Sequence, residues 1–351
     1  KFRLTKTGCD KIFNNMDCAG IPLQDTSGLR AYAEGMTRAL LAACLLAPVL
    51  LPAQDAGPVF RADVNLVRVD VDVAGRGDGR PLTAADFVVL DNGRPQQVTH
   101  STRDELPLDL ILLFDISGSM KPGVKRVAAG ARAALAQLRP GDRAAVFAFE
   151  GRLRPLLALT ADLEKVRQTI EQDLLSLEFS GTTALQASIH AAAAHFPEQE
   201  PGARRRAMLV ITDNRGNNPG VHLPEVINRL WRLDVVVSGL ILRMPGEVRR
   251  VKQIGVTARA RRSLKEARDA AGMDPIVEAT GGEMVRTGDP EDDFKDTLKR
   301  LRQRYTLYYP MPEGPPGEQR TIKVELTPEG RRHAGRPKLL ARTGYQTPPA
   351  R

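Results

Sequence analysis

Cysteine is scarce in this chain of 351 residues: its three cysteines are Cys9, Cys18 and Cys44, and all of them precede residue 45. Neither these cysteines nor the five histidines pair at the spacing of a zinc site. The sequence also lacks a Gly-x-Ser-x-Gly turn, a Walker A loop and a His-Glu-x-x-His motif. The sequence therefore gives no support to the common classes of serine hydrolase, nucleotide-binding enzyme and zinc protease.

Aromatic residues are also few, at 5% of the chain, and no apolar run reaches the roughly 20 residues of a stable membrane span. Hydrophobic residues make up 42% and charged residues 26%, which is typical of a globular protein. This balance excludes a disordered acidic tail, a collagen-like repeat and a polytopic membrane protein. The length predicts about two domains.

The net charge of +9 permits binding to nucleic acid or anionic lipid but does not establish it. Arginine clusters at 204–206, 249–250 and 259–262 have no aromatic residues between them. We therefore interpret these clusters as solvated faces and expect no nucleic-acid partner.

Residues 36–53 have the features of a secretory signal peptide. A short basic start at Met36–Arg38 precedes an apolar run, and a small residue, Ala53, ends it. We therefore expect an exported protein, secreted or held in the periplasm or cell envelope. A lipid anchor at Cys44 is the alternative, because Leu41–Cys44 resembles a lipobox. Residues 1–35 show no sustained period, and we interpret them as a non-native upstream segment.

The segment 59–106 is predicted to be a small β module. Apolar residues alternate over 60–73, which is the period of a strand, and the phase slips at Leu66–Val67. Asp91–Gly93 then separates two short strand patterns, and an Asn-Gly pair suits the positive φ angles of a hairpin turn.

From Pro107 the pattern changes to strands that alternate with helices. Leu108–Phe114 is almost continuously apolar, as in a parallel strand covered on both faces. Further strands are predicted at 144–149, 207–212, 235–242 and 283–286, and helices at 124–138, 160–177, 183–196, 223–233, 264–271 and 292–304. Thr160 is expected to cap the second of these helices. The order predicts an α/β domain over 107–301 with a doubly wound, Rossmann-like and mainly parallel sheet, followed by a C-terminal β extension over 302–346.

Polar side chains follow the predicted strands at the points where they end. Asp115, Ser117 and Ser119 occupy alternate positions after the first strand, Thr183 stands in a loop before a helix, and Asp213 ends a later strand. In open α/β sheets, ligands bind beyond the carboxyl ends of the strands. Two carboxylates and three hydroxyls at that edge form an oxygen-only set, which suits a hard divalent cation.

At these residues the sequence resembles the von Willebrand factor A-type domain, whose metal-ion-dependent adhesion site reads Asp-x-Ser-x-Ser, then Thr, then Asp. The resemblance covers about 107–301 and places the metal ligands at Asp115, Ser117, Ser119, Thr183 and Asp213.

Two positions depart from the family pattern. Asn214 follows the last aspartate where the family usually has glycine, and Thr182 stands where a second glycine is usual. Thr182 is therefore an alternative ligand to Thr183. The flanking segments resemble the VWFA-related family described from Acidobacteria, on Asp86-Phe87, Asp91–Gly93 and the tyrosine-rich closing strands.

The resemblance implies binding rather than catalysis. Ser117, Ser119 and Thr183 would touch a Mg²⁺ ion, with Mn²⁺ or Ca²⁺ as alternatives, while Asp115 and Asp213 would hold its waters. A Glu or Asp of a partner protein would complete the octahedron through a charge-assisted contact. We therefore expect an exported adhesion module that is not an enzyme and that associates with the cell envelope.

Other interpretations stay open at this point. A metal-dependent extracytoplasmic hydrolase and a structural envelope protein with a merely stabilising metal site both fit the same motif. A site-free alternative has Asp115 capping a helix while the serines satisfy backbone groups. The sequence names neither the partner nor the oligomeric state.

Overall fold

The computed structural model describes residues 66–75, 77–197, 204–216, 221–243, 272–335 and 337–349. The expectations for the upstream segment at 1–35, the signal peptide at 36–53 and the helix at 264–271 lie outside these residues. Among the helices of the described ranges, none is long and apolar enough to cross a membrane.

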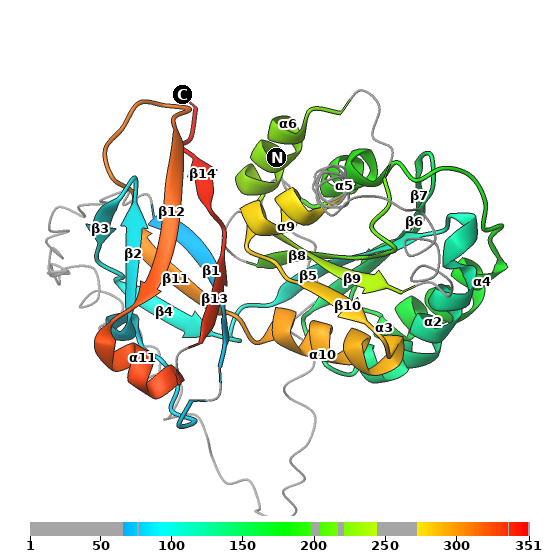
Figure 1. The fold of residues 1–351 in the computed structure, drawn as a ribbon, viewed down its shortest axis with the longest axis horizontal. Helices are drawn as coiled ribbons and strands as arrows, with labels where there is room; N and C mark the ends of the chain where they lie inside the picture. Colours follow the sequence, from blue (N-terminus) through cyan, green and yellow to red (C-terminus); the bar gives the residue numbers. More distant parts are fainter. Residues whose placement is uncertain are drawn as a thin grey trace, which may run out of the picture. The chain divides into compact units, whose positions relative to one another are not determined.

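A six-stranded sheet forms the centre of the α/β region (Figure 1). In spatial order its strands are β10 (Met284–Thr287), β9 (Val235–Leu242), β8 (Arg205–Thr212), β5 (Leu108–Asp115), β6 (Arg143–Phe149) and β7 (Leu153–Thr160). Neighbouring strands run parallel except for β7, which is antiparallel to β6. The mainly parallel α/β sheet that the sequence predicts is confirmed.

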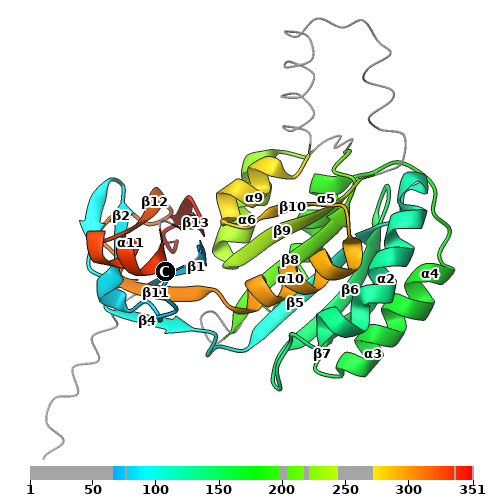
Figure 2. The same ribbon diagram turned by 60° about the horizontal axis from the view of Figure 1, so that its bottom comes forward.

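Helices cover both faces of this sheet (Figures 1 and 2). One face carries α2 (Lys121–Leu135), α3 (Leu163–Gln168), α4 (Leu174–Ser176) and α10 (Pro290–Arg302), and the other carries α5 (Leu185–Ala193), α6 (Leu223–Arg232) and α9 (Asp274–Thr280). Leu110 and Leu112 of β5 pack against the first set, whereas Ile111 and Leu113 pack against the second. A strand buried on both faces needs a continuous apolar sequence, which is the pattern that predicted β5.

The segment between β6 and α5 differs from the expectation. Residues 153–160 form the edge strand β7, so Thr160 ends a strand and does not cap a helix. Helix α3 instead begins after Asp162, whose side chain accepts a hydrogen bond from the backbone N of Lys165 at 3.0 Å. The half-buried β7 lacks strict alternation and contains Pro155, which an edge strand tolerates. A π-helical turn at Thr169–Asp173 joins α3 to α4.

The flanking strands form two four-stranded sheets, in the orders β13–β1–β11–β4 and β14–β12–β2–β3. Their bounds are β1 (Leu66–Ala74), β2 (Phe87–Asp91), β3 (Arg94–Gln96), β4 (His100–Arg103), β11 (Tyr305–Pro310), β12 (Gln319–Leu326), β13 (Lys338–Ala341) and β14 (Gly344–Gln346), with helix α11 (Pro328–Ala334) after β12. Each sheet mixes strands from before and after the α/β region. The two flanks therefore share one hydrophobic core, to which Val69, Val89 and Leu307 belong.

The hairpin between β2 and β3 follows the sequence prediction, since Asn92 and Gly93 adopt φ angles of +47° and +76°. The residue before this turn, Asp91, joins the two sheets from inside and is fully buried. Its Oδ2 accepts hydrogen bonds from the hydroxyls of Tyr309 and Tyr345, both at 2.9 Å, and its Oδ1 accepts one from Arg320 Nε at 2.7 Å. Burial raises the pKa of both tyrosines, so their hydroxyls stay protonated and donate.

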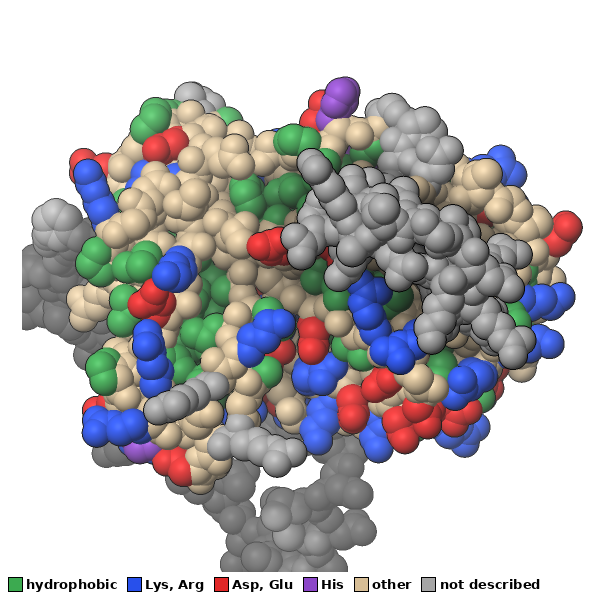
Figure 3. Space-filling view, viewed as in Figure 1, with side chains coloured by type: hydrophobic (Ala, Val, Ile, Leu, Met, Phe, Trp, Pro, Cys, Tyr) green, Lys and Arg blue, Asp and Glu red, His purple; other side chains and the backbone are tan. Residues whose placement is uncertain are grey.

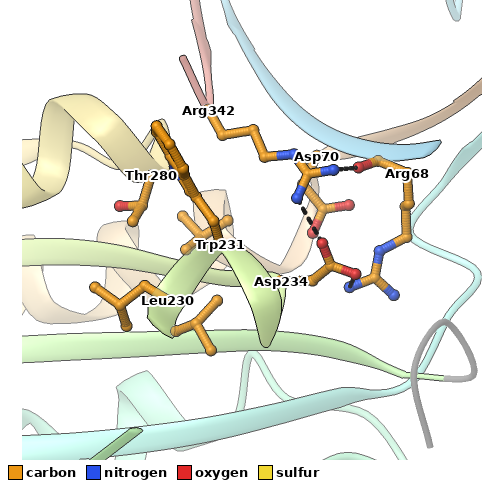
Figure 4. Close-up of a pocket in the computed structure, with 9 residues that line it drawn as sticks. Arg68, Asp70, Leu230, Trp231, Asp234, Thr280 and Arg342 are labelled. Carbon is orange, nitrogen blue, oxygen red and sulfur yellow. Dashed lines mark hydrogen bonds and ion pairs between the residues drawn. The ribbon is translucent and has the colours of Figure 1, made fainter. Parts of the chain in front are cut away.

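Ion pairs connect the β strands to the α/β region (Figure 4). Arg205 of β8 lies 3.4 Å from Asp70 of β1. Asp234, in the turn before β9, accepts a hydrogen bond from Arg342 at 2.6 Å and lies 3.6 Å from Arg68. A cavity of about 10 Å³ remains among these side chains, which is room for about one water molecule. The ion-paired side chains of this junction therefore leave little free space between them.

Candidate metal centre

Strand β5 ends in Asp115, which is fully buried at the carboxyl edge of the central sheet. Its Oδ1 accepts a hydrogen bond from the backbone N of Ser117 at 2.9 Å, the local bond with which aspartate commonly starts a turn. Its Oδ2 accepts a hydrogen bond from the hydroxyl of Thr212 at 2.7 Å. Both carboxylate oxygens are therefore fixed by neutral donors, one from the loop after β5 and one from the end of the adjacent strand β8.

Two loops of the predicted site meet at this edge: the first loop, which follows β5 and carries Ser117 and Ser119, and the third loop, which follows β8 and carries Asp213. Ser117 Oγ lies 3.5 Å from Ser119 Oγ, and Ser119 Oγ donates a hydrogen bond to Asp213 Oδ2 at 3.1 Å. The backbone N of Arg215 donates to the other oxygen of Asp213 at 3.1 Å. Four of the five predicted site residues therefore lie in one hydrogen-bonded group, although they are up to 98 positions apart in the sequence.

The second loop, which precedes α5 and carries Thr182 and Thr183, lies against the first loop. Ser180 N donates to the carbonyl of Ile116 at 3.1 Å, and Ala184 N donates to the carbonyl of Glu150 at 2.7 Å. Between these anchors, Thr183 is half-buried and Thr182 is exposed. No hydrogen bond between described residues joins either threonine hydroxyl to the group around Asp115, so the choice between the two threonines stays a prediction.

Two buried carboxylates, Asp115 and Asp213, dominate the electrostatics of this group. Burial raises the pKa of Asp115 to about 6, with a smaller contribution from the negative charge of Asp213. Across the part of the chain that the structure describes, no arginine or lysine forms an ion pair with Asp115. Asp213 is approached by Arg215, whose Nε lies 3.7 Å from Oδ2 and whose side chain is 48% exposed.

The oxygen atoms fit a small divalent cation. Adjacent ligands of an octahedral ion with bonds of about 2.1 Å lie about 3 Å apart, and the hydroxyls of Ser117 and Ser119 are separated by 3.5 Å. Asp213 Oδ2, at 3.1 Å from Ser119 Oγ, is close enough to orient that hydroxyl. The described residues contain no group of three or more His, Cys, Asp or Glu side chains that could hold a metal. This centre is of another kind, because serine hydroxyls supply much of its donor set.

The sequence analysis missed two residues of this centre. Thr212, fully buried at the end of β8, supplies the hydroxyl bound to Asp115. Asn214, 2% exposed, adopts φ +59°, the left-handed region that glycine favours. A polar residue directly before Asp213 was the available signal for Thr212. Asn214 stood out only as a departure from the family pattern, although asparagine is among the residues that best tolerate this conformation.

The cluster Arg204–Arg206 is not the solvated face that we expected. Arg205 is 2% exposed, and its guanidinium donates to the carbonyls of Leu301 and Arg302 at 2.6 and 2.8 Å. Arg206 is also buried and donates to the carbonyl of Leu233 at 2.9 Å, while the half-buried Arg204 pairs with Asp109 at 2.7 Å. On the face drawn in Figure 3, Lys and Arg side chains stand beside Asp and Glu and form no continuous basic patch. The clusters at 249–250 and 259–262 lie outside the described residues.

Residues 110–217 match the family model of the von Willebrand factor type A domain. This range contains β6, β7 and β8, all of β5 except its first two residues, and all five predicted ligands. The chain therefore contains a von Willebrand factor type A domain, which confirms the resemblance seen in the sequence and fits a protein-interaction module. The likeness of the flanks to the family from Acidobacteria stays a prediction.

Several solved structures are similar to parts of the chain. An aerotolerance-related membrane protein from Bacteroides fragilis is 21% identical, with 55% of this chain and 98% of that chain covered and a TM-score of 0.42. A von Willebrand factor type A protein from Catenulispora acidiphila is 14% identical, with 82% and 75% covered and a TM-score of 0.42. A pilus adhesin from Lactobacillus rhamnosus GG is 12% identical, with 80% and 47% covered and a TM-score of 0.42. Among curated proteins, none matches the chain.

Proposed function

We propose that the protein is an exported binding module that captures an acidic side chain of a partner protein through a divalent cation, Mg²⁺ in the first instance. The observation that carries this proposal is the buried carboxylate of Asp115, which is held by neutral donors only and lies in one group with Asp213 and two serine hydroxyls. A buried negative charge without a cation is costly, and a bound metal ion would compensate it.

The side chains divide into two roles in this proposal. Ser117, Ser119 and a threonine of the second loop, Thr183 or Thr182, would contact the ion directly. Asp115 and Asp213 would orient these hydroxyls and hold water molecules around the ion. When bound, the cation supplies an electrophilic position that a carboxylate oxygen can occupy. The neutral serine ligands matter because they leave more of the positive charge for that carboxylate.

Binding is favoured over catalysis by the chemistry of the surrounding residues. The sequence has none of the common hydrolase motifs, and the two serines of the site lie next to carboxylates and not next to a histidine. Export is supported by the signal-peptide pattern at 36–53. The partner would therefore be a protein of the cell envelope or the extracellular space that presents Asp or Glu.

The experiment is a binding assay with the full chain immobilised and extracts of the source envelope as the partner pool, in Mg²⁺ and in EDTA. We expect one or more proteins to be retained in Mg²⁺ and released by EDTA. Asp115→Ala and Ser119→Ala should abolish this retention. Asp296→Ala, which removes an exposed carboxylate of α10, is the matched control and should leave it unchanged.

Retention that is insensitive to both EDTA and Asp115→Ala would contradict the proposal. A rise in melting temperature with Mg²⁺ but no metal-dependent retention would instead assign the site a structural role. Turnover of a substrate that requires the metal and is lost in Asp115→Asn would assign it to a hydrolase.

A further inference from the structure

The third loop of the candidate metal centre is tied to the start of α9 by the side chain of Asn214. Its Oδ1 accepts a hydrogen bond from the backbone N of Met273 at 2.9 Å, and its Nδ2 donates to Asp274 Oδ2 at 2.6 Å. Its own backbone N donates to Thr212 Oγ1 at 3.1 Å, the same hydroxyl that binds Asp115. Asn214 therefore connects Asp115 and Asp213 to a turn almost 60 residues further along the chain.

The same turn also holds the second loop. Gln186, in the first turn of α5, donates from Nε2 to the carbonyl of Gly272 at 2.8 Å. Helix α5 begins directly after the loop that contains Thr182 and Thr183. Residues 272–274 therefore contact, through Gln186 and Asn214, the two loops that carry the threonine and the second aspartate.

The sequence of the turn is suited to this contact. A Cβ atom built on Gly272 would lie 2.6 Å from Asn214 Oδ1, so any other residue at this position would displace the asparagine side chain. The far end of α9 is also fixed, because Trp231 Nε1 donates to the carbonyl of Ala279 at 2.9 Å. Helix α9 is therefore held in place at its far end, and it can support the loops that contact its start.

We infer that Asn214 is a positioning residue of the metal centre: with Gln186 and residues 272–274 it forms a clasp that fixes the second and third loops before the cation binds. This inference rests on the proposed function. A glycine at position 214 would adopt the same backbone angles but would leave Met273 N without its side-chain acceptor and would remove the amide donor to Asp274, whose other partner is Arg286 at 3.8 Å. The asparagine therefore adds preorganisation that the usual glycine of the family does not provide.

Partners that orient metal ligands from outside typically change cation affinity by about 10- to 100-fold when they are removed. The test is calorimetric titration of the full chain with MgCl₂, beside thermal unfolding in EDTA. We expect Asn214→Gly to weaken Mg²⁺ binding by about 10-fold or more. Gln186→Ala, which loosens the second loop without touching the third, should weaken it in the same direction.

The matched control is Asn92→Gly. Asn92 also has a positive φ, +47°, and its Oδ1 accepts a hydrogen bond from Thr321 N at 2.8 Å, but it lies in the β2–β3 hairpin. This change should lower the melting temperature in EDTA and leave Mg²⁺ affinity within about twofold. Among the described residues, no hydrogen bond or ion pair joins the hairpin to the metal loops. The pair of variants separates a loss of stability from a loss of preorganisation.

Two results would overturn the inference, and they are distinguishable. If the wild-type chain binds Mg²⁺ and Asn214→Gly binds it equally well while only its melting temperature falls, the clasp is merely structural and the proposed function stands. If the wild-type chain itself binds no divalent cation, the proposed function fails and the clasp fails with it.

Discussion

The two ends of the central sheet treat buried carboxylates in opposite ways. At the amino ends of the strands, Asp109 lies 2.7 Å from both Arg143 and Arg204, and Asp142 lies 3.0 Å from Arg302. At the carboxyl ends, Asp115 is equally buried but is held by a hydroxyl and a backbone amide. At the amino ends, arginine neutralises the buried negative charge. At the carboxyl ends, the charge of Asp115 is left available to a cation.

This difference separates a structural role from a binding role. A buried carboxylate paired with arginine is complete in the folded chain, and breaking the pair is costly. A buried carboxylate with only neutral donors keeps a raised pKa, as Asp115 does at about 6, until a cation reaches it.

The largest effect is expected from Arg302→Met at the amino end. Methionine replaces the apolar part of the arginine side chain, but the fully buried carboxylate of Asp142 loses the guanidinium group with which it pairs. Loss of one partner of a buried pair costs about 3 kcal/mol or more. Urea unfolding should show this loss, and Mg²⁺ should not restore it. The double variant Asp142→Asn, Arg302→Met should recover part of the stability, and a loss below about 1 kcal/mol in the single variant would contradict the comparison.

A second prediction concerns the pH dependence of stability in EDTA. Because the folded pKa of Asp115 is raised from 3.8 to about 6, the native state holds this proton more tightly than the unfolded state. Its stabilising contribution is complete below pH 4 and is lost as the pH rises through 6, by about 3 kcal/mol in total.

Asp115→Asn removes this titration while an amide can still bond to Ser117 N and Thr212. The variant should therefore be more stable than the wild type at pH 7.5 in EDTA, and the difference should vanish near pH 4. The difference between the two chains is the quantity to measure, because other carboxylates titrate in both. A wild type that remains more stable than Asp115→Asn at pH 7.5 in EDTA would show that the carboxylate is already compensated.

A smaller loss of stability is expected at the junction between the β strands and the α/β region, where an arginine–carboxylate cluster is partly exposed. Asp234→Asn tolerates the φ of +52° at this position but removes the charge that faces Arg68 and Arg342. Because the side chain of Asp234 is 26% exposed, we expect a loss of about 1 kcal/mol or less. A loss as large as that of Arg302→Met would mean that burial does not determine how much stability is lost when an ion pair is broken.

The structure was predicted best where the sequence pattern lies within a few consecutive residues. β5 was evident because both of its faces are buried, and the loop from Asp115 to Ser119 carries its pattern within five residues. Its partner Asp213 could be placed at the same edge because parallel strands end together. The observed bond between Ser119 and Asp213 agrees with that placement.

The features that the sequence did not indicate depend on tertiary contacts. The pairing of β1 with β11 joins residues more than 230 positions apart and leaves no local pattern. Helix α9 has seven residues, too few for a clear helical period. Arg205 resembled a surface residue because arginine is usually exposed, yet the carbonyl groups at the end of α10 make its burial favourable. The clasp around Asn214 is visible only once residues 272–274 are placed beside the third loop.

The most direct test of the account is the position of a bound cation. Crystals of the full chain grown in saturating Mn²⁺ and measured at the manganese absorption edge should give an anomalous difference peak. We predict one peak at the carboxyl edge of the central sheet, within bonding distance of Ser117 Oγ and Ser119 Oγ and beside Asp115 and Asp213. A map with manganese elsewhere and none at this edge would contradict the account.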